Sequence, residues 1–590
     1  MAELLDVIGL LHRADWTRLS LSAQVRFEKD GDQARRREKA ITAEMARLVG
    51  YEPGAWGGRS VDDELSLEPE GYHRWRADLL IAPGGRYRLD YGGEYGGRTE
   101  GRDGEQVWTL ASPAAEIPPS HVPGADGEIP VPDLFRPAGL LAGCTLEVRG
   151  PATACGRAAI AVTATPRPGG SGSITSLFSR PRGPVELLVD AETGILLRRD
   201  ETFEGQLLIL AELTTVTMGP PEADDLARFA PPAGSRPGRD SRKHETPDRS
   251  GPGWDALKNA ADLAAAGLGA WMRLSPHLTG HDQADADRTE VAMPSPEPGP
   301  LGPGEGAPVS DDLLGLLYRS GLDDGVEPVV RDVVMRRWAD TRPELAKATD
   351  SARAAGLGGV GYLFDSAARR GTVTLTTARL RVGGPDLYHV DYPDRPSRAG
   401  LVAVACDGQQ RWQVYEHGTL VGPPAPLMSD VWNLTCSSWL LGEQLSGGAE
   451  VTYHGRRGHH LRVTRGDGEL RAGPVTNTPY DAIVDAETGC LLRLIAYDND
   501  APTNWWELDH ITMGPGGPAD PASFRPDLPP GTRIVKTSGN PVADLAAVAP
   551  GLSGTAARAA TEAVRRTAGA VSAARSLLDD LRGTPRPPRS

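Results

Sequence analysis

The chain has 590 residues, a formal net charge of −16 and a sequence pI near 5.3. This acidic balance argues against nucleic acid or an anionic membrane as the main partner, because both require a positive protein surface. Hydrophobic residues make up 39% and charged residues 24% of the chain, which is typical of a globular protein. The length predicts about two to four domains.

The N-terminal segment, MAELLDVIGLLHRADW, predicts an amphipathic helix. Its apolar residues fall on one helical face: Leu4, Leu5, Ile8 and Leu11. Asp6 interrupts the apolar run, so the segment does not resemble a secretory signal peptide. Elsewhere in the chain, no apolar run approaches the ~20 residues that a transmembrane helix needs. We therefore expect a cytoplasmic protein without a transmembrane segment.

One stretch of sequence occurs twice. Residues 189–220 read VDAETGILLRRDETFEGQLLILAELTTVTMGP, and residues 484–515 read VDAETGCLLRLIAYDNDAPTNWWELDHITMGP. The two copies are identical at 15 of 32 positions, with a constant offset of 295 residues. An internal repeat of this kind predicts a tandem duplication, in which each half forms a similar unit.

Each copy predicts a β-hairpin followed by a longer strand. In the first copy, Val185–Val189 reads as a strand and Ile195–Arg199 as its return strand. Between them, Asp190–Gly194 (DAETG) is a turn in which Asp can bond its own backbone and Gly can adopt a positive φ. Gln206–Met218 then shows the alternation of a further strand.

The order of such signals in each half resembles the LolA/LolB lipoprotein-carrier superfamily, which includes RseB-type regulatory domains and mycobacterial lipid-binding lipoproteins. The matching segments of the first half are GGRYRLDY (84–91), DGEQVW (103–108), PAGLLAG (137–143), ACGRAAIAV (154–162), LLVDAETGILLR (187–198) and the closing Phe229 with Pro231. Those of the second half are YHVDY (388–392), DGQQRW (407–412), SSWLLG (437–442), HGRRGHHLRV (454–463), IVDAETGCLLR (483–493) and Phe524 with Pro526.

The resemblance implies an α+β fold. We expect two tandem LolA-like open, strongly curved antiparallel β-sheets (half-barrels), each with a helix across its mouth, plus accessory Ala-rich helices. The expected boundaries are residues 1–232 for LolA-like domain 1, 233–308 for a Pro/Gly-rich linker containing a helix at 254–274, 309–536 for LolA-like domain 2, and 537–590 for an amphipathic C-terminal helix and tail. In the second half we also expect helices over three segments: Asp311–Tyr318, Val329–Ala339 and Pro343–Ala355.

A curved sheet closed by a helix can hold a hydrophobic ligand between its layers. The resemblance implies a non-enzymatic binding protein that holds a lipid or acyl chain in one or both halves. Candidate cavity-lining residues are Tyr87, Trp108, Leu188, Leu208, Leu210, Tyr388, Trp412, Ile483, Trp505 and Trp506. A filled core is the alternative for each of them. In the second copy Trp505 and Trp506 replace Leu210 and Ala211, so two inward-facing sites there would differ in shape.

An RseB-like module that binds a protein partner is the alternative function, and an uncharacterised enzyme is the second alternative. The sequence has no HExxH, GxSxG or P-loop signature, and residues 356–361 match GxGxxG without the strand before it that a dinucleotide site needs. We interpret His454, His459 and His460 as exposed strand residues, with the last two on opposite faces. The five cysteines show no CxxC spacing and predict reduced thiols. No cofactor and no metal site are predicted.

Overall fold

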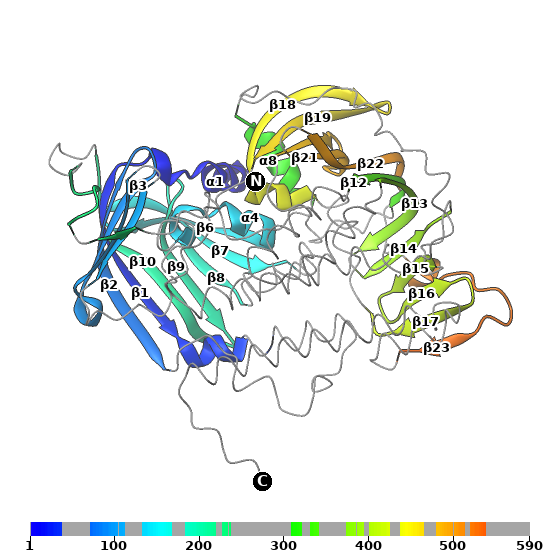
Figure 1. Cartoon of the computed structure of the whole chain (residues 1–590), viewed down its shortest axis with the longest axis horizontal. Coiled ribbons are helices and arrows are strands. Elements are labelled where there is room, and N and C mark those ends of the chain that lie inside the picture. The colour runs from blue at the N-terminus through cyan, green and yellow to red at the C-terminus, as the bar shows by residue number, and fades with distance from the viewer. Residues whose placement is uncertain are drawn as a thin grey trace, which may run out of the picture. The chain divides into compact units, whose positions relative to one another are not determined.

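The protein has an α+β fold with two large, open sheets, seen in a computed structural model (Figure 1). The structure describes residues 2–37, 40, 71–103, 106–111, 132–167, 183–219, 227–233, 235–237, 308–320, 331–340, 373–384, 386–393, 401–424, 437–464, 479–498, 501–513 and 520–537. Among these residues, no helix is both long and apolar enough to cross a membrane.

The first sheet is antiparallel and has the strand order β11-β5-β4-β3-β2-β1-β10-β9-β8-β7-β6 in the described part of the chain. Its strands are β1 (Leu21–Asp30), β2 (Tyr72–Ala82), β3 (Arg86–Tyr91), β4 (Arg98–Asp103), β5 (Gln106–Ala111), β6 (Cys144–Ala154), β7 (Arg157–Pro166), β8 (Val185–Asp190), β9 (Leu196–Phe203), β10 (Gln206–Met218) and β11 (Arg236–Pro237). The predicted hairpin and its following strand are confirmed as β8, β9 and β10.

The second sheet has the order β18-β19-β20-β21-β22-β12-β13-β14-β15-β16-β17-β23 among the described strands. These are β12 (Arg331–Asp340), β13 (Val373–Gly384), β14 (Leu387–Asp391), β15 (Leu401–Asp407), β16 (Arg411–Tyr415), β17 (Gly418–Gly422), β18 (Gln444–Tyr453), β19 (Arg456–Thr464), β20 (Tyr480–Asp485), β21 (Leu491–Asp498), β22 (Ala501–Met513) and β23 (Ile534–Lys536). Read in reverse, this order repeats that of the first sheet with one added strand, β17.

One predicted helix is a strand in the structure. The segment Val329–Ala339, expected to be helical, contains most of β12, which pairs with β13 on one side and β22 on the other. Its β-branched residues favour a central strand over a helix. The helix expected over Asp311–Tyr318 is confirmed as α8 (Asp311–Arg319), whereas those at 254–274 and 343–355 and in the C-terminal tail lie outside the described residues.

Alternation along β1 gives the first sheet two distinct faces. Val25 and Phe27 are buried and alternate with Arg26 and the exposed Gln24. We call the side that bears Phe27 the apolar face and the side that bears Arg26 the polar face. Because paired residues of neighbouring strands share a face, the register of the strand pairs assigns each remaining strand position to one of the two faces.

The repeated DAETG turn has the same geometry in both copies. Asp190 accepts hydrogen bonds from the backbone N–H of Thr193 at 2.9 Å and from its hydroxyl at 2.9 Å. Asp485 accepts the same pair from Thr488, each at 2.8 Å. Gly194 and Gly489 close the turns with φ of 75° and 71°, a conformation that favours glycine. The predicted turn chemistry is confirmed in both.

The described chain divides into two compact units. Unit 1 comprises Met1–His244, Glu297–Val326 and Met428–Leu494, and unit 2 comprises Glu245–Pro296, Glu327–Leu427 and Ile495–Ser590. Unit 1 thus takes segments from both halves of the sequence. The domain boundaries expected at residues 232, 308 and 536 stay a prediction.

Short helices accompany the strands of unit 1: α1 (Ala2–Arg13), η1 (Trp16–Arg18), α3 (Pro132–Phe135), α4 (Ala138–Gly143), α8 and η3 (Ser437–Gly442). The helix predicted at the N-terminus is confirmed, and Ile8 and Leu11 on its predicted apolar face are buried. Helix α1 packs against β6, α4 and α8, which lie together in Figure 1. The helical segments α3 and η1 pack against β9 and β2.

Candidate binding site

The apolar face of the first sheet carries an aromatic cluster at its centre. Phe27 of β1 stacks on Trp75 of β2 with ring centroids 5.2 Å apart, and Trp75 meets Tyr91 of β3 edge-on at 5.3 Å. The register explains the cluster, because Phe27 pairs with Trp75 across the two strands. At the end of the strands, Trp16 of η1 packs edge-on against Tyr87 at 6.0 Å, so η1 covers this part of the face.

Charged side chains flank this cluster on the same face. On β4, Arg98 donates to Glu100 at 2.5 Å, and both are almost fully buried. On β9, Arg199 donates to Glu201 at 2.7 Å, again in a buried position. Burial, with Glu100 as the next cause, raises the pKa of Tyr91 well above its ordinary value, so this phenol stays neutral.

These buried ion pairs are not among the residues that the sequence analysis singled out. Buried ion pairs are costly to desolvate and tolerable only when their hydrogen bonds are satisfied. The signal in the sequence was weak, because alternating charges on a strand ordinarily indicate a solvated face. Their place on the apolar face is set by register, since Arg199 pairs with Leu187 and with Ala211.

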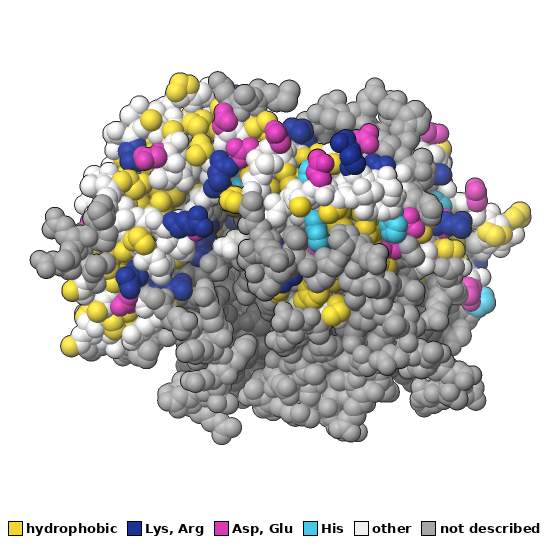
Figure 2. Space-filling model, turned by 90° about the horizontal axis from the view of Figure 1, so that it is seen from above, with side chains coloured by type: hydrophobic (Ala, Val, Ile, Leu, Met, Phe, Trp, Pro, Cys, Tyr) yellow, Lys and Arg dark blue, Asp and Glu magenta, His cyan; other side chains and the backbone are white. Residues whose placement is uncertain are grey.

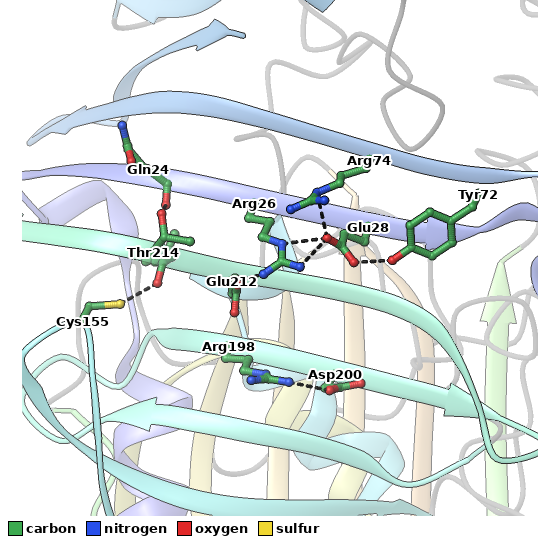
Figure 3. A network of polar contacts seen from close by, with 11 residues as sticks. Gln24, Arg26, Glu28, Tyr72, Arg74, Cys155, Arg198, Asp200, Glu212 and Thr214 are labelled. Atoms are coloured by element: carbon green, nitrogen blue, oxygen red, sulfur yellow. Dashed lines mark hydrogen bonds and ion pairs between the residues drawn. The ribbon is translucent and has the colours of Figure 1, made fainter. Parts of the chain in front are cut away.

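The polar face of the first sheet carries an ion-pair network, drawn in Figure 3. Arg26 of β1 donates to Glu28 at 2.7 Å and to Glu212 of β10 at 2.9 Å. Arg74 of β2 lies 3.0 Å from Glu28, and the Tyr72 hydroxyl donates to the same carboxylate. Burial alone would raise the pKa of Glu28, but the hydrogen bonds from Tyr72 and Arg26 outweigh it and lower the pKa.

In the second copy, an aspartate, an arginine and a histidine form a buried hydrogen-bonded triad. Asp481, at the position of Glu186, accepts from Arg493 at 2.8 Å and contacts His460 at 2.7 Å. All three are buried, whereas Glu186 is exposed. The interpretation of His460 as an exposed residue is therefore wrong, although His454 is exposed and His459 bonds instead to the Gly448 carbonyl. Whether His460 is buried depends on the elements that pack over its strand. The alternation of residues along the strand does not reveal those elements.

The structure places the first-half candidate residues on both faces of the sheet. Tyr87 lies on the apolar face, but Trp108 pairs with Gly101 on the polar face, where its indole N–H donates to the Phe229 carbonyl at 2.9 Å. Leu188 and Leu210 also lie on the polar face, because they pair with Arg198 and Asp200. Leu208 sits at a β-bulge and packs in a cluster with Ala34 and Phe203.

The second-half candidates are divided in the same way. In unit 2, Tyr388 and Trp506 share a face by register, while Trp505 points to the opposite face and packs with Ile495 and Tyr497. Trp412 also lies on the face opposite Tyr388. Ile483 belongs to β20 in unit 1 and pairs with His460.

Nine of these ten candidates are buried and Leu188 is half-buried. Each buried side chain is therefore covered by protein on nearly all of its surface. Whether any of them contacts a ligand stays a prediction. Among the described residues, His, Cys, Asp and Glu side chains form no group of three that could hold a metal ion. The four described cysteines are free thiols, as predicted for them.

Surface charge in the described part of the chain is mixed. Figure 2 shows basic and acidic side chains lying among one another on the face that it displays. Such interspersed charge is typical of a solvated protein surface.

No protein-family model matches the chain, and no curated protein matches it. Among solved structures, it is similar to MucB with 18% identity over 40% of this chain and 66% of that chain, at a TM-score of 0.25. LprF from Mycobacterium bovis matches with 12% identity over 38% of this chain and 97% of its own, at 0.22. A LolA superfamily protein from Nitrosomonas europaea matches with 8% identity over 37% and 95%, at 0.16.

The likeness to these chains concerns the fold alone. The matched region spans just under two thirds of MucB and 60% of that chain in the Pseudomonas aeruginosa MucA/MucB complex. The chain is an α+β protein built on two large, open sheets.

Proposed function

We propose that the protein is a non-enzymatic binding protein of the LolA-like class that holds a lipid or acyl-chain ligand. The observation that carries this proposal is the apolar face of the first sheet. It bears the Phe27–Trp75–Tyr91 cluster, and one end of it is covered by the short helix η1. Burial of an acyl chain on such a surface would contribute roughly 0.8 kcal/mol for each methylene group.

The two ion pairs beside the aromatic cluster support a ligand with a polar end. Arg98–Glu100 and Arg199–Glu201 place charge on either side of the rings, on strands β4 and β9. An amphiphile could lay its chain on the rings while its polar group meets one of the pairs. Tyr91 adds a neutral hydroxyl within 3.5 Å of Glu100.

Native mass spectrometry of the purified full chain tests this function. We expect a mass excess that disappears on denaturation and that organic extraction recovers as an acyl lipid. A chain that carries no such ligand, and that takes up no palmitate or phospholipid when these are supplied, would exclude the proposal.

A protein partner is the second candidate. The near-complete burial of the candidate residues favours it, because a ligand inside the sheet would have to displace protein that already covers them. MucB, to which the chain is similar in fold, has been solved in complex with MucA. In the same experiment, a lipid-free chain that retains a second polypeptide in fixed stoichiometry would favour this alternative.

We also propose a cytoplasmic location, in line with the expectation from the sequence. Fractionation of the native cell with antibodies against the full chain tests it, and recovery with the membrane or outside the cell would refute it.

A further inference from the structure

Two helices that precede the two sheets in sequence are related by a constant offset. Residues 8–13 of α1 read IGLLHR, and residues 314–319 of α8 read LGLLYR, 306 positions later. Gly9 thus corresponds to Gly315, and His12 to Tyr318. Both helices belong to unit 1, where they pack against each other.

The contact between these helices is reciprocal. A Cβ at Gly9 would lie 2.6 Å from Oδ1 of Asp311, and a Cβ at Gly315 would lie 2.3 Å from Cδ2 of Leu5. Leu5 and Asp311 are themselves 306 residues apart. Gly9 thus contacts Asp311, and Gly315 contacts Leu5, which is the residue equivalent to Asp311. The same contact is therefore made twice with the two helices exchanged, as at an isologous dimer interface.

A second pair of helices repeats this arrangement. Helix α4 packs against η3, α1 packs against α4, and α8 packs against η3. Leu140 and Leu141 of α4 are buried, as are Leu440 and Leu441 of η3. Equivalent elements of the two halves thus meet each other in pairs.

Each helix also contacts the repeated turn of its own half. A Cβ at Gly194 would lie 2.1 Å from the carbonyl oxygen of Leu10 in α1. A Cβ at Gly489 would lie 3.1 Å from that of Leu316 in α8. Leu10 and Leu316 again share the offset of 306 residues, so the two turns and the two helices form one continuous chain of contacts.

Polar contacts fasten the helix of the second half to the first sheet. The backbone N–H of Leu146 in β6 donates to the Tyr318 hydroxyl of α8 at 2.5 Å. The guanidinium of Arg167 lies over the Tyr318 ring at 4.5 Å and donates to the Cys144 carbonyl at 3.0 Å. Arg13 of α1 forms an ion pair with Asp311 of α8.

We propose that these four helical segments form a reciprocal lid. Helices α1 and α4 of the first half contact α8 and η3 of the second half, respectively. The helices of one half therefore do not leave their strands unless those of the other half move with them. Release of α1 and α4 from β6 then requires release of α8 and η3 as well, and we assign the same coupled release to ligand entry. This inference rests on the proposed function for its purpose, but the coupling itself is a property of the helices.

A cross-link tests the coupling in the full chain. The Leu5→Cys/Gly315→Cys double variant removes the close contact between Cδ2 of Leu5 and residue 315. Because Cγ of Leu5 lies 3.7 Å from the Cβ position of residue 315, the two introduced cysteines are within reach of a disulfide. Hydrogen exchange is followed in α4 and η3, which carry no substitution. On oxidation we expect exchange in both segments to slow about tenfold relative to the reduced protein. Slowing in only one of them, or in neither, would overturn the reciprocal lid.

A loosening variant gives the opposite signal. Gly9→Leu places a side chain against Asp311 and Arg13, and we expect faster exchange in α8 and η3 as well as in α1. Asp6→Leu, at an exposed position of the same helix, is the matched control and should leave η3 unchanged. Faster exchange confined to α1 in Gly9→Leu would contradict the proposal.

Ligand uptake separates this inference from the proposed function. With palmitate as probe, we expect the oxidised cross-linked protein to take it up at least about tenfold more slowly than the reduced one. If the wild-type chain binds no palmitate, the lipid proposal fails while the exchange measurements still decide the lid. If palmitate binds equally fast with the cross-link closed, the lid is refuted and the lipid proposal stands.

Discussion

Arg157 and Asp190 form a bidentate ion pair at the first repeated turn. Nε of Arg157 lies 2.5 Å from Oδ2 of Asp190, and Nη2 of Arg157 lies 3.1 Å from Oδ1. Arg456 and Asp485 repeat it at 2.6 Å and 3.1 Å. Burial alone would raise the pKa of each aspartate, but the hydrogen bonds from arginine and threonine outweigh it and lower the pKa. Both turns are thus fixed by a charged group that stays ionised.

Replacing this carboxylate should destabilise the protein. Asp190→Asn removes the buried carboxylate partner of Arg157, which keeps only the exposed Glu192, and should lower the free energy of unfolding by about 3 kcal/mol. Glu192→Gln removes the exposed member of the same network and should cost less than about 0.5 kcal/mol. Urea denaturation of both variants measures the difference, and equal effects would refute the assigned role of Asp190.

Acid should weaken the same turns. Because the folded-state pKa of Asp190 and Asp485 is below the unfolded value, their contribution is present above that unfolded value of about 3.9. It is lost as the pH falls through the lower folded-state pKa. The Asp190→Asn variant should therefore lose less stability than the wild type in this acid window, measured by urea unfolding at several pH values.

The buried triad of the second copy predicts a large asymmetry between the halves. Asp481→Asn breaks contacts with Arg493 and His460 in a buried site and should cost about 3–5 kcal/mol. Glu186→Gln, at the corresponding exposed position of the first copy, should cost less than about 1 kcal/mol. Thermal unfolding compares them, and a Glu186 effect as large as that of Asp481 would contradict the assigned burial.

Because Gly101 has no side chain, the Trp108 ring can pack over it on the polar face. A Cβ at Gly101 would lie 2.3 Å from Cζ2 of Trp108, so Gly101→Ala should displace the ring and cost about 1–3 kcal/mol. At Gly92 the nearest atom to a Cβ is 3.6 Å away and φ is −107°, so Gly92→Ala should change stability by less than about 0.5 kcal/mol. Tryptophan fluorescence and urea denaturation measure both.

We expect His12 to make the stability of the protein depend on pH in a second, less acidic range. Burial is the main cause that lowers its pKa to about 4, and Arg13 lowers it further, while the Glu443 backbone and Asp311 act in the opposite direction. The unfolded state therefore binds the proton more readily, so stability is complete above about pH 6.5 and falls toward pH 4, by up to about 3 kcal/mol. In His12→Phe the urea midpoint should change less between pH 7 and 5 than in the wild type. A change as large as that of the wild type would refute this.

Ala211→Trp tests the proposed ligand site. Ala211 lies on the apolar face between Phe27 and Arg199, and Trp506 holds the corresponding position in the second copy. Filling this position with an indole should reduce ligand occupancy at least about tenfold, measured by native mass spectrometry. Thr202→Val, on the polar face of β9, is the control and should leave occupancy unchanged. Full occupancy in Ala211→Trp would place the ligand elsewhere.

The sequence by itself determined the features that depend on near neighbours. The DAETG turns, the hairpin after Val185 and the helix before Trp16 were all predicted, because turn hydrogen bonds and helical periodicity act over a few residues. The repeat offset of 295 residues predicted two similar units, and the two sheets share one strand order apart from the added β17.

The tertiary structure alone decided which strand positions face inward and which segments meet. The strand register places Trp108 and Leu210 on the face opposite Tyr87, and β12 is a strand that pairs with β13 and β22. Likewise, the burial of His460 and the contact of Gly9 with Asp311 join residues whose partners are distant in sequence. Such contacts follow from packing over the whole chain, which local patterns do not encode.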